Sequence, residues 1–362
     1  MHIPDNASSL TPEWLTQTLR AAGVIEWASV TAIERAALSN DQGVTGQLVR
    51  LRLTYDRNEQ DAPSSIIAKF PTSDPQVRDF IFTVTRHYQR ESFFYQELAN
   101  KVVVRVAQRY YSAVDVDAQK IILLIEDLAP AQTLDKIAGC PPQAAARILR
   151  ALAYLHAQWW EQPELADLTA IAFDSPSLAQ QAQSLYREAW ELLRAKIESR
   201  LPAAFVNTGE WLADHLAAIY NRLQKAPRTL LHRDVAVDNL LFAPSNVDAD
   251  PIFIDWQMFS VGRGAQDAAY LIGRGMTPAE RRHAAEELLR LYWTTLTGLG
   301  VQGYSFAQCL DDYRLALYRS FAEIVISSAH ADMSEQQAHT VYEVLVPRHI
   351  EALLEHDVSA LF

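Results

Sequence analysis

Four polar side chains near the middle of the chain stand at spacings that suit phosphoryl transfer. His232, Asp234 and Asn239 follow the pattern H-x-D-x-x-x-x-N. Asp255 comes directly after an apolar, β-branched run that predicts a buried strand. In such a set the carboxylate of Asp234 would orient an attacking hydroxyl and accept its proton, while Asn239 and Asp255 would hold Mg2+, which prefers oxygen ligands. The four residues therefore predict phosphoryl transfer from a nucleotide.

These residues also have ordinary structural explanations. Asp234 could cap a helix, and Asp255 could begin a turn at the end of a strand. The H-x-D-x-x-x-x-N string is short enough to arise by chance. The functional interpretation therefore depends on features elsewhere in the chain.

A lysine and a glutamate upstream provide one such feature. Residues 64–70 predict a strand that carries Lys69, and residues 86–100 predict a helix that carries Glu91. Glu91 shares a helix face with the apolar residues three, four and seven positions later, and a carboxylate buried without a partner is costly. We therefore expect an ion pair with Lys69, although an exposed edge-strand lysine is the alternative. Such a pair points an ammonium group at nucleotide phosphates.

A glycine-containing segment, residues 39–46, lies between predicted strands 28–38 and 47–55. A strand–glycine turn–strand arrangement can lay backbone N–H groups over phosphates, and Gly43 and Gly46 would permit this. An ordinary hairpin loop is the alternative.

The apolar run 120–125 predicts another buried strand, which a polar, proline-containing stretch ends. A chain that leaves one lobe for another at such a break can offer backbone groups to an adenine ring, here from Glu126 and Leu128. We place a boundary at this point, with a first lobe over residues 1–128 and a second over 129–362.

The predicted elements indicate an α+β fold with two lobes. The smaller first lobe has an antiparallel sheet and a helix over 10–23, with Thr11 as its cap and Pro12 at its first position. The larger second lobe is mainly helical. His156 lies on an apolar helix stripe, where it is expected to be a hydrogen-bonded core residue. Helices of the second lobe are predicted at 143–160, 177–199, 208–225, 279–297, 305–329 and 335–356.

The bulk composition narrows the function classes. The chain of 362 residues is long enough for two cores, and its net charge of −12 argues against nucleic acid as a partner. Cys140 and Cys309 show neither metal-ligand spacing nor a disulfide framework. No apolar run reaches membrane-spanning length, and the N-terminus lacks the pattern of a signal peptide. These features predict a cytoplasmic protein without a membrane partner.

Several motifs together resemble the aminoglycoside phosphotransferase-like kinases, and within them the ecdysteroid kinase-like (choline kinase-related) branch. The resemblance covers most of the chain and is thin over 161–228 and after 275. The motifs that carry it are Arg90-Glu91-Ser92-Phe93-Phe94-Tyr95, Leu124-Ile125-Glu126-Asp127-Leu128-Ala129-Pro130, Gly139-Cys140, Leu155-His156-Ala157-Gln158-Trp159-Trp160, His232-Arg233-Asp234 with Asn239, Ile254-Asp255-Trp256-Gln257 and Gly262-Arg263-Gly264-Ala265-Gln266-Asp267.

The resemblance implies a two-lobed, protein-kinase-like fold and a role for each matching residue. Asp234 would be the catalytic base in the loop that His232 begins, and Asp267 would buttress that loop. Asn239 and Asp255 would be the magnesium ligands, and Lys69 with Glu91 would orient the phosphates.

One residue departs from the pattern. Arg233 stands where relatives carry glycine or another small residue, and the resulting His-Arg-Asp triplet is that of protein kinases. Ala236, however, replaces the lysine with which protein kinases contact phosphate. In addition, Trp-Gln follows Asp255, and only about a dozen residues separate it from Asp267, too few for an activation loop. These features favour a small-molecule acceptor over a peptide.

The sequence therefore predicts a small-molecule kinase that moves the γ-phosphate of ATP, with GTP as the alternative, to a hydroxyl group. A pseudokinase that binds nucleotide, or a small-molecule-binding protein without turnover, are the alternatives from other classes. By resemblance the acceptor is expected to be apolar or steroid-like, with an aminoglycoside or another cationic alcohol as the alternative.

Overall fold

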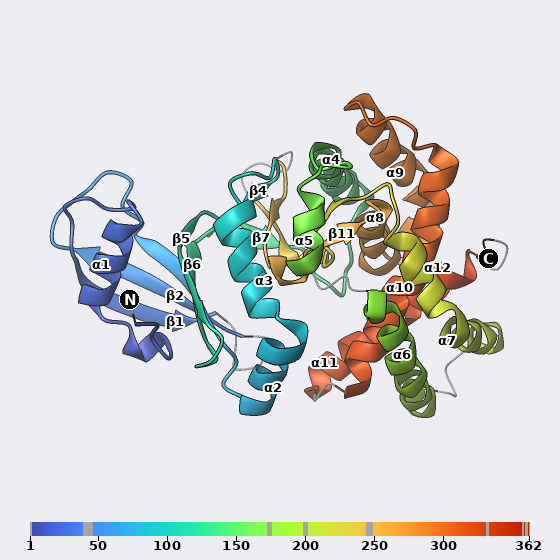
Figure 1. Cartoon of the computed structure of the whole chain (residues 1–362), viewed down its shortest axis with the longest axis horizontal. Helices are drawn as coiled ribbons and strands as arrows, with labels where there is room; N and C mark the ends of the chain where they lie inside the picture. The colour runs from blue at the N-terminus through green and yellow to red at the C-terminus, as the bar shows by residue number, and fades with distance from the viewer. Residues whose placement is uncertain are drawn as a thin grey trace. The chain divides into compact units, whose positions relative to one another are not determined.

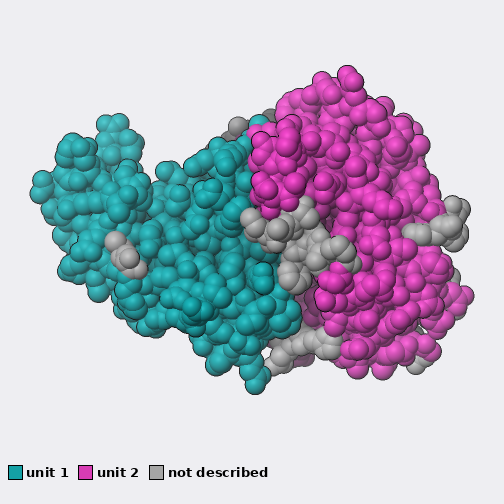
Figure 2. Space-filling view, viewed as in Figure 1, with its two compact units in different colours: residues 1–131, 252–258 teal, residues 132–251, 259–362 magenta. Residues whose placement is uncertain are grey.

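The structure is a computed structural model, which describes residues 2–38, 46–171, 176–197, 202–243, 249–330, 333–356, 358 and 361. The chain forms two compact units, coloured separately in Figure 2. The first comprises residues 1–131 and 252–258, and the second comprises 132–251 and 259–362. The division at residue 131 lies close to the boundary expected at 128. Residues 252–258, which that boundary placed in the second lobe, pack with the first unit.

An antiparallel five-stranded sheet is the frame of the first unit, in the order β1-β2-β3-β6-β5 (Figure 1). Its strands are β1 (Val30–Ala37), β2 (Gln47–Tyr55), β3 (Ser65–Phe70), β5 (Arg109–Asp115) and β6 (Lys120–Glu126). Along β2, Leu51 and Leu53 are buried while Arg52 and Thr54 are exposed, as the alternation in the sequence predicts. No strand was expected over β5, which pairs with β6 at one edge of the sheet.

Helix α1 (Pro12–Ala21) covers one face of this sheet. The side chain of Thr11 caps it, accepting a hydrogen bond from the Trp14 amide at 3.1 Å. Leu15 and Leu19 of the helix share one core with apolar residues of β2, β3 and β6. A short 3-10 turn, η1 (Ala7–Ser9), precedes the helix.

Two further helical segments of the first unit each change from α to π geometry. Helix α2 (Pro75–Phe80) continues into η2 (Ile81–Thr85), and α3 (His87–Phe93) continues into η3 (Phe94–Leu98). The second pair occupies the helix predicted at 86–100. The short strand β4 (Arg105–Val106) pairs in parallel with β10 (Ile252–Phe253), and η6 (Trp256–Met258) follows. This pairing brings the segment around Asp255 into the first unit.

The second unit is built mainly of helices. The long helix α10 packs against α6, α7, α8, α9 and α12, and α4 packs against α9. The helix predicted at 335–356 is divided into α11, a π-helical turn and α12. The helical segments are α4 (Pro142–Gln158), α5 (Leu165–Ile171), α6 (Pro176–Ile197), α7 (Ala203–Leu223), α8 (Ala265–Tyr270), η7 (Leu271–Gly275), α9 (Pro278–Gly298), α10 (Phe306–His330), α11 (Glu335–His339), η8 (Thr340–Leu345) and α12 (Val346–Leu354).

Short strands complete the second unit. Strand β8 (Thr229–Leu231) is antiparallel to β11 (Ser260–Gly262), and β7 (Gln132–Thr133) is antiparallel to β9 (Leu240–Phe242). A 3-10 turn, η5 (Val237–Asn239), lies between β8 and β9. Among the described residues, no helix is both long and apolar enough to cross a membrane.

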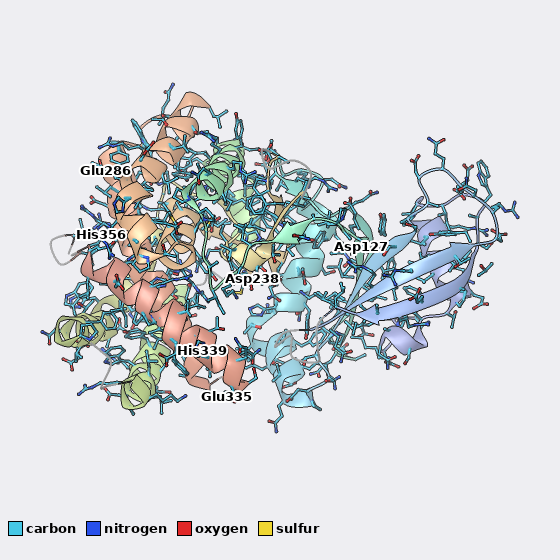
Figure 3. All side chains as sticks on the ribbon, turned by 180° about the vertical axis from the view of Figure 1, so that it is seen from behind. Asp127, Asp238, Glu286, Glu335, His339 and His356 are labelled. Carbon is cyan, nitrogen blue, oxygen red and sulfur yellow. The ribbon has the colours of Figure 1, made fainter. Side chains whose placement is uncertain are left out.

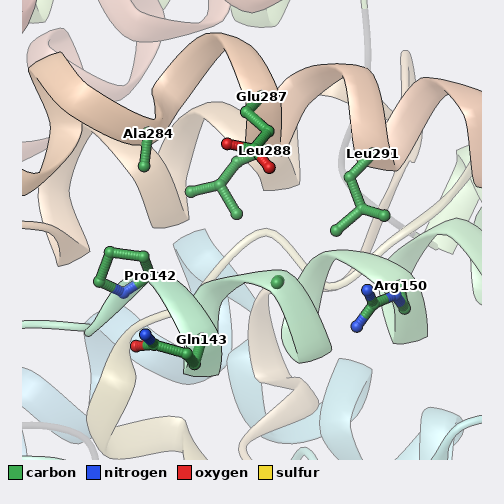
Figure 4. Close-up of a pocket in the computed structure, with 8 residues that line it drawn as sticks. Pro142, Gln143, Arg150, Ala284, Glu287, Leu288 and Leu291 are labelled. Atoms are coloured by element: carbon green, nitrogen blue, oxygen red, sulfur yellow. The ribbon is translucent and has the colours of Figure 1, made fainter.

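A pocket of about 260 Å³ lies between α4 and α9, and Figure 4 shows its lining. Both apolar and charged side chains contribute to it. None of the residues expected in the site lines it. The lining residues are Pro142, Gln143, Ala146, Arg150, Ala284, Glu287, Leu288 and Leu291.

Candidate active site

The predicted catalytic loop leaves the buried strand β8 and is held by one carboxylate at the start of α8. Asp267 accepts the backbone N–H of His232 at 2.8 Å and that of Arg233 at 2.9 Å. Its side chain is fully buried. Burial favours the neutral form of this carboxyl group, but hydrogen bonding and nearby positive charge outweigh it, so the pKa of Asp267 lies below its ordinary value. An ionised Asp267 can thus hold the turn of the loop.

A buried histidine supports Asp267 from behind. Nε2 of His156 lies 3.2 Å from Asp267 Oδ2, and the hydroxyl of Tyr292 lies 2.8 Å from His156 Nδ1. Because an ionised carboxylate can only accept, Nε2 donates to Asp267. Gly264 allows this close approach, since a Cβ at that position would overlap the Tyr292 hydroxyl. The expectation that His156 is a satisfied core histidine is confirmed, and its partner is the loop-holding carboxylate.

Asp234, the predicted base, is half-buried, and a tyrosine hydroxyl holds its carboxylate. The hydroxyl of Tyr270 donates to Asp234 Oδ1. One helical turn later, Arg274 donates from NH1 to that same hydroxyl at 2.7 Å. The side-chain nitrogen of Asn239 donates to the backbone carbonyl of Asp234 at 3.1 Å, which leaves the amide oxygen of Asn239 as an acceptor. The loop therefore presents one carboxylate oxygen and one amide oxygen.

The contacts of Arg233 explain how this loop accommodates a large residue at a position where a small one was expected. Its φ is +71°, in the left-handed region that glycine adopts most readily. The buried guanidinium pairs with Glu323 and donates to Gln266 Oε1 at 3.1 Å. Arg319 donates to the same two acceptors, at 3.2 and 2.8 Å. Contacts of the side chain thus offset the backbone strain, and in this arrangement Arg233 serves the structure of the loop.

The charges in this cluster are partly balanced. Burial favours the neutral form of Glu323, but the two guanidinium groups outweigh it and lower its pKa. Arg319 also lies over the ring of Tyr220, 4.1 Å from its centroid. The cluster therefore links the catalytic loop to α10 through charge-assisted hydrogen bonds, which are stronger than neutral ones.

The first unit contains the second set of predicted residues. Lys69 Nζ lies 2.6 Å from Glu91 Oε2 and 3.6 Å from Asp255 Oδ1. The side chains of Lys69 and Glu91 are only 9% and 4% exposed, so the expected ion pair is confirmed and buried. Burial alone would lower the pKa of Lys69, but the two carboxylates raise it above its ordinary value. Lys69 is therefore a buried cation that two acids share.

An aromatic stack positions the segment that carries Asp255. Trp256 is fully buried and lies flat on Phe94 of η3, with ring centroids 3.9 Å apart. Gln257 donates to Asp255 Oδ2 at 3.2 Å, and Asp255 itself has a left-handed φ of +61°. The Trp-Gln dipeptide after Asp255 thus packs against the helix that carries Glu91.

Of the two glycines expected to approach phosphates, Gly43 lies outside the described residues. Gly46 is described, and a Cβ there would lie 2.9 Å from the carbonyl oxygen of Phe70 and 3.4 Å from Lys69 Cε. A side chain at this position would therefore disturb the neighbouring strand and its lysine. This close approach explains the glycine, whereas its contact with phosphate stays a prediction.

The segment after β6 is anchored by Asp127, which Figure 3 labels. Its carboxylate pairs with Arg50 at 2.6 Å and accepts from the hydroxyl of Ser65 at 2.5 Å. The side chain of Glu126 forms an ion pair with Arg105 at 2.6 Å, within the first unit.

The backbone of Leu128 has a different environment from that of Glu126. Its carbonyl accepts from the Ala131 amide at 2.9 Å, while its own amide meets no acceptor among the described residues. The Glu126 amide is already bonded to the carbonyl of Gln108 at 2.8 Å. Of the two expected adenine contacts, Leu128 is thus the one with a backbone donor to offer.

Two described side-chain oxygens, one in each unit, are of the kind that Mg2+ prefers. Oδ1 of Asp255 is buried and accepts no hydrogen bond from the described residues, with Lys69 Nζ 3.6 Å away. The amide oxygen of Asn239 is an available acceptor. Within the described residues, no three His, Cys, Asp or Glu side chains gather into a metal site of their own. Magnesium that is bound with nucleotide needs only one or two protein oxygens, because phosphates and water supply the rest.

Tyr270, Arg274 and the partner of Arg233 were not among the residues expected in the site. Tyr270 and Arg274 follow Asp267 by three and seven residues, which places them on one face of a continuing helix. That periodicity is the signal that could have indicated them. Glu323 carries no such signal, because it lies far along the chain on α10.

The fold and the two sets of residues are those of the kinase-like small-molecule phosphotransferases. Solved structures with this fold include a choline kinase from Cryptosporidium parvum Iowa II, with a TM-score of 0.54, 9% identity and coverage of 90% of this chain and 87% of that one. An ethanolamine kinase from Plasmodium vivax has a TM-score of 0.53, 11% identity and coverage of 89% and 81%. The GDP complex of aminoglycoside 2'-phosphotransferase-IIIa has a TM-score of 0.53, 13% identity and coverage of 94% and 100%.

The ecdysteroid kinase-like family model matches residues 41–300, which is more than half of the chain, and the protein belongs to that family. No match to the sequence was found among curated proteins. The resemblance noted in the sequence, the two-lobed α+β fold class and the assignment to small-molecule kinases are confirmed.

Proposed function

We propose that the protein transfers the γ-phosphate of ATP to a hydroxyl group of a small organic molecule. The observation that carries this proposal is the buried Lys69, which Glu91 and Asp255 share at 2.6 and 3.6 Å. A lysine in this arrangement can orient nucleotide phosphates, and its carboxylate partners keep it charged. The backbone amide of Leu128 would contact the adenine ring.

Residues of the catalytic loop would carry the chemical step. The acceptor oxygen attacks the γ-phosphorus and forms a P–O bond, while its proton passes to Asp234. The bond between the γ-phosphorus and the β–γ bridging oxygen breaks, and ADP leaves with that electron pair. Asp267 would keep the loop in place through the N–H groups of His232 and Arg233.

Asn239 and Asp255 would hold magnesium, which neutralises phosphate charge when it is bound. Oδ1 of Asp255 supports this role, because it is buried, accepts no hydrogen bond within the described part of the chain and lies 3.6 Å from Lys69 Nζ, so a bound cation would compensate its burial. As the strand–glycine turn–strand pattern of the sequence predicts, Gly43 and Gly46 would lay backbone N–H groups over the phosphates.

An apolar or steroid-like acceptor is the finer part of the proposal. A polycationic acceptor would need several free carboxylates that converge on it. By resemblance, the helices between 141 and 228 and after 275 would form the acceptor side of the site. Of the acids Glu191, Asp214, Asp311, Asp312 and Glu323 on these helices, four are instead paired with arginines. The pairs are Asp214 with Arg187 at 2.9 Å, Asp311 with Arg314 at 3.6 Å, Asp312 with Arg263 at 2.6 Å, and Glu323 with Arg233 and Arg319.

The aromatic residues of these helices do not strengthen that choice. Most of them are buried in the core of the second unit and hence cannot line an open site. The buried ones are Tyr186, Trp190, Tyr220, Tyr292, Tyr313, Tyr318 and Phe321. The choline kinase, ethanolamine kinase and aminoglycoside phosphotransferase with the same fold favour the second candidate, a cationic alcohol.

A phosphorylation screen distinguishes these acceptors. The protein would be incubated with radiolabelled ATP and a library of apolar alcohols, sterols, amino alcohols and aminoglycosides. We expect label transfer to an apolar, hydroxyl-bearing compound, with a KM that depends little on salt. Efficient transfer to an aminoglycoside, weakening steeply as salt is raised, would instead establish the cationic alternative.

The variant Asp234→Asn tests the catalytic assignment against a pseudokinase or a binding protein. We expect turnover to fall by at least about a hundredfold while ATP affinity is retained. Asp5→Asn, the same chemical change at an exposed ion pair with Lys120 in the first unit, is the matched control and should leave turnover unchanged. Normal turnover in Asp234→Asn with intact folding would refute the assignment. A wild-type protein that binds ATP but neither hydrolyses nor transfers it would support the alternatives.

A further inference from the structure

A tyrosine and an arginine on consecutive helical turns of the second unit converge on the predicted base. Tyr270, the last residue of α8, is 7% exposed and donates its hydroxyl proton to Asp234 Oδ1. Arg274, in η7, donates to the Tyr270 hydroxyl at 2.7 Å. Its guanidinium also lies over the Tyr270 ring, 4.8 Å from the centroid. The three side chains therefore form a hydrogen-bond chain in which Arg274 donates to Tyr270 and Tyr270 donates to Asp234.

The charge of Arg274 is directed at the hydroxyl and ring of Tyr270. Among the described residues, no carboxylate lies within ion-pair distance of its guanidinium. Burial raises the pKa of the Tyr270 hydroxyl, Arg274 opposes this effect, and Asp234 reinforces it, so the hydroxyl stays protonated and remains a donor. Since Tyr270 occupies Oδ1 of Asp234, Oδ2 is the oxygen left to accept a proton.

In the catalytic loop Arg233 directly precedes Asp234, but its guanidinium is paired with Glu323 and bonded to Gln266. Ala236 stands two residues after Asp234, at the place where protein kinases carry a lysine. The residues between Asp234 and Asn239 include Asp238, which is itself paired with Lys136 at 2.5 Å. Because Arg233 is engaged by Glu323, a further positive charge that acts on the base has to come from another element, and Arg274 has the position to supply it.

We propose that Tyr270 and Arg274 are positioning residues that act as one unit on Asp234. Tyr270 fixes the carboxylate so that Oδ2 faces the reacting hydroxyl. Arg274 holds Tyr270 and replaces the positive charge that the loop does not carry at position 236. This inference rests on the proposed function of Asp234 as the base.

Kinetics of four variants test the unit. Two reactions are measured. One is the hydrolysis of magnesium-ATP, in which water is the acceptor, and the other is phosphoryl transfer to the acceptor found in the screen. Tyr270→Phe removes only the hydroxyl, and we expect kcat to fall by about 10- to 100-fold, as for one hydrogen bond to a charged group. The KM for ATP should change by less than about twofold, because the lost contact is not to the nucleotide.

The other variants address the arginine. Arg274→Met should resemble Tyr270→Phe, and the double variant should be little worse than either single one, since both remove the same restraint. Arg274→Lys, which retains the charge, should recover part of the lost kcat. Tyr154→Phe and Arg290→Met, at exposed positions on α4 and α9, are the matched controls and should match the wild type.

Two outcomes would overturn the proposal. One is an unchanged kcat in Tyr270→Phe. The other is an effect of Arg274→Met confined to the KM of the acceptor, which would make Arg274 a direct acceptor contact instead of a positioning residue.

Proton NMR of the tyrosine hydroxyl gives a readout that does not need activity. A hydroxyl proton that exchanges slowly with water should disappear in Tyr270→Phe and shift in both Asp234→Asn and Arg274→Met. If the wild type shows this pattern but neither hydrolyses nor transfers phosphate, the proposed function fails while the hydrogen-bonded unit stands. If no such proton is observed, or if it is insensitive to Asp234 and Arg274, the unit itself is refuted.

Discussion

Replacing Lys69 with methionine should destabilise the protein far more than the loss of one surface charge. The ammonium group lies 2.6 Å from Glu91 and 3.6 Å from Asp255. At an effective dielectric constant of about 20, these two attractions amount to about 6 and about 5 kcal/mol. Burial of the ions opposes most of this, so the intact cluster contributes little net stability. Lys69→Met alone, however, leaves two acids together without a counterion.

The expected cost of that uncompensated charge is about 3–5 kcal/mol in the free energy of unfolding. The variant Glu91→Met should cost a similar amount, since it leaves a buried ammonium with only the more distant Asp255. In the double variant Lys69→Met/Glu91→Met, both buried charges of the close pair are replaced by apolar groups of similar size. We therefore expect the double variant to be less destabilised than the sum of the single ones, by about 2–4 kcal/mol.

Urea unfolding followed by tryptophan fluorescence measures these free energies. Lys120→Met is the matched control, because its ammonium pairs with the exposed Asp5 at 2.7 Å in the same unit. It should have a much smaller effect. ATP turnover gives a second readout, in which each single variant is impaired and the double variant is little worse than the more damaged one. Additive losses in both stability and turnover would show that Lys69 and Glu91 do not act as a pair.

Three further predictions follow from buried groups of the second unit. Asp267→Asn should lower the free energy of unfolding by about 3 kcal/mol at neutral pH, since the carboxylate accepts two loop N–H groups. The folded-state pKa of Asp267 lies below its ordinary 3.8. The stabilisation is therefore complete above about pH 4 and is lost as the pH falls through the folded-state pKa. Urea unfolding between pH 3 and pH 7 measures this, and a pH dependence unchanged by Asp267→Asn would contradict it. Burial raises the pKa of the free thiols of Cys140 and Cys309 to about 12. Neither thiol should therefore react with a thiol reagent at pH 8 until the protein is unfolded, and fast labelling of the native protein would contradict this. Gly209→Ala should destabilise by about 1–3 kcal/mol, because its Cβ would overlap the ring of Trp190, and an unchanged melting temperature would refute that packing.

Local sequence determined much of the candidate site. The spacing from His232 to Asn239 identified the loop, and helix periodicity identified Glu91 as a carboxylate that needed a partner. Because an unpaired buried charge is so costly, the only lysine on the preceding predicted strand was the expected partner, and the structure places the two 2.6 Å apart. Caps and periodic apolar residues likewise predicted most of the long helices, because these signals lie within one or two turns of chain.

Contacts between distant segments decided the rest. The strand β5 takes its place from pairing with β6, and a strand at a sheet edge has a weaker pattern than a central one. Residues 252–258 join the first unit because β10 pairs with β4 and Trp256 stacks on Phe94. None of these partners can be read from spacing, since each is fixed by packing in three dimensions.

Arg233 shows most clearly what only the tertiary structure could decide. From the sequence alone it was a departure that put the geometry of the catalytic loop in question. In the folded protein its left-handed backbone is held by Asp267, and its guanidinium is neutralised by Glu323 from α10. A buried charge is tolerated only when a partner is in reach. That partner comes from far along the chain, so the tertiary fold determines whether an arginine can occupy this position.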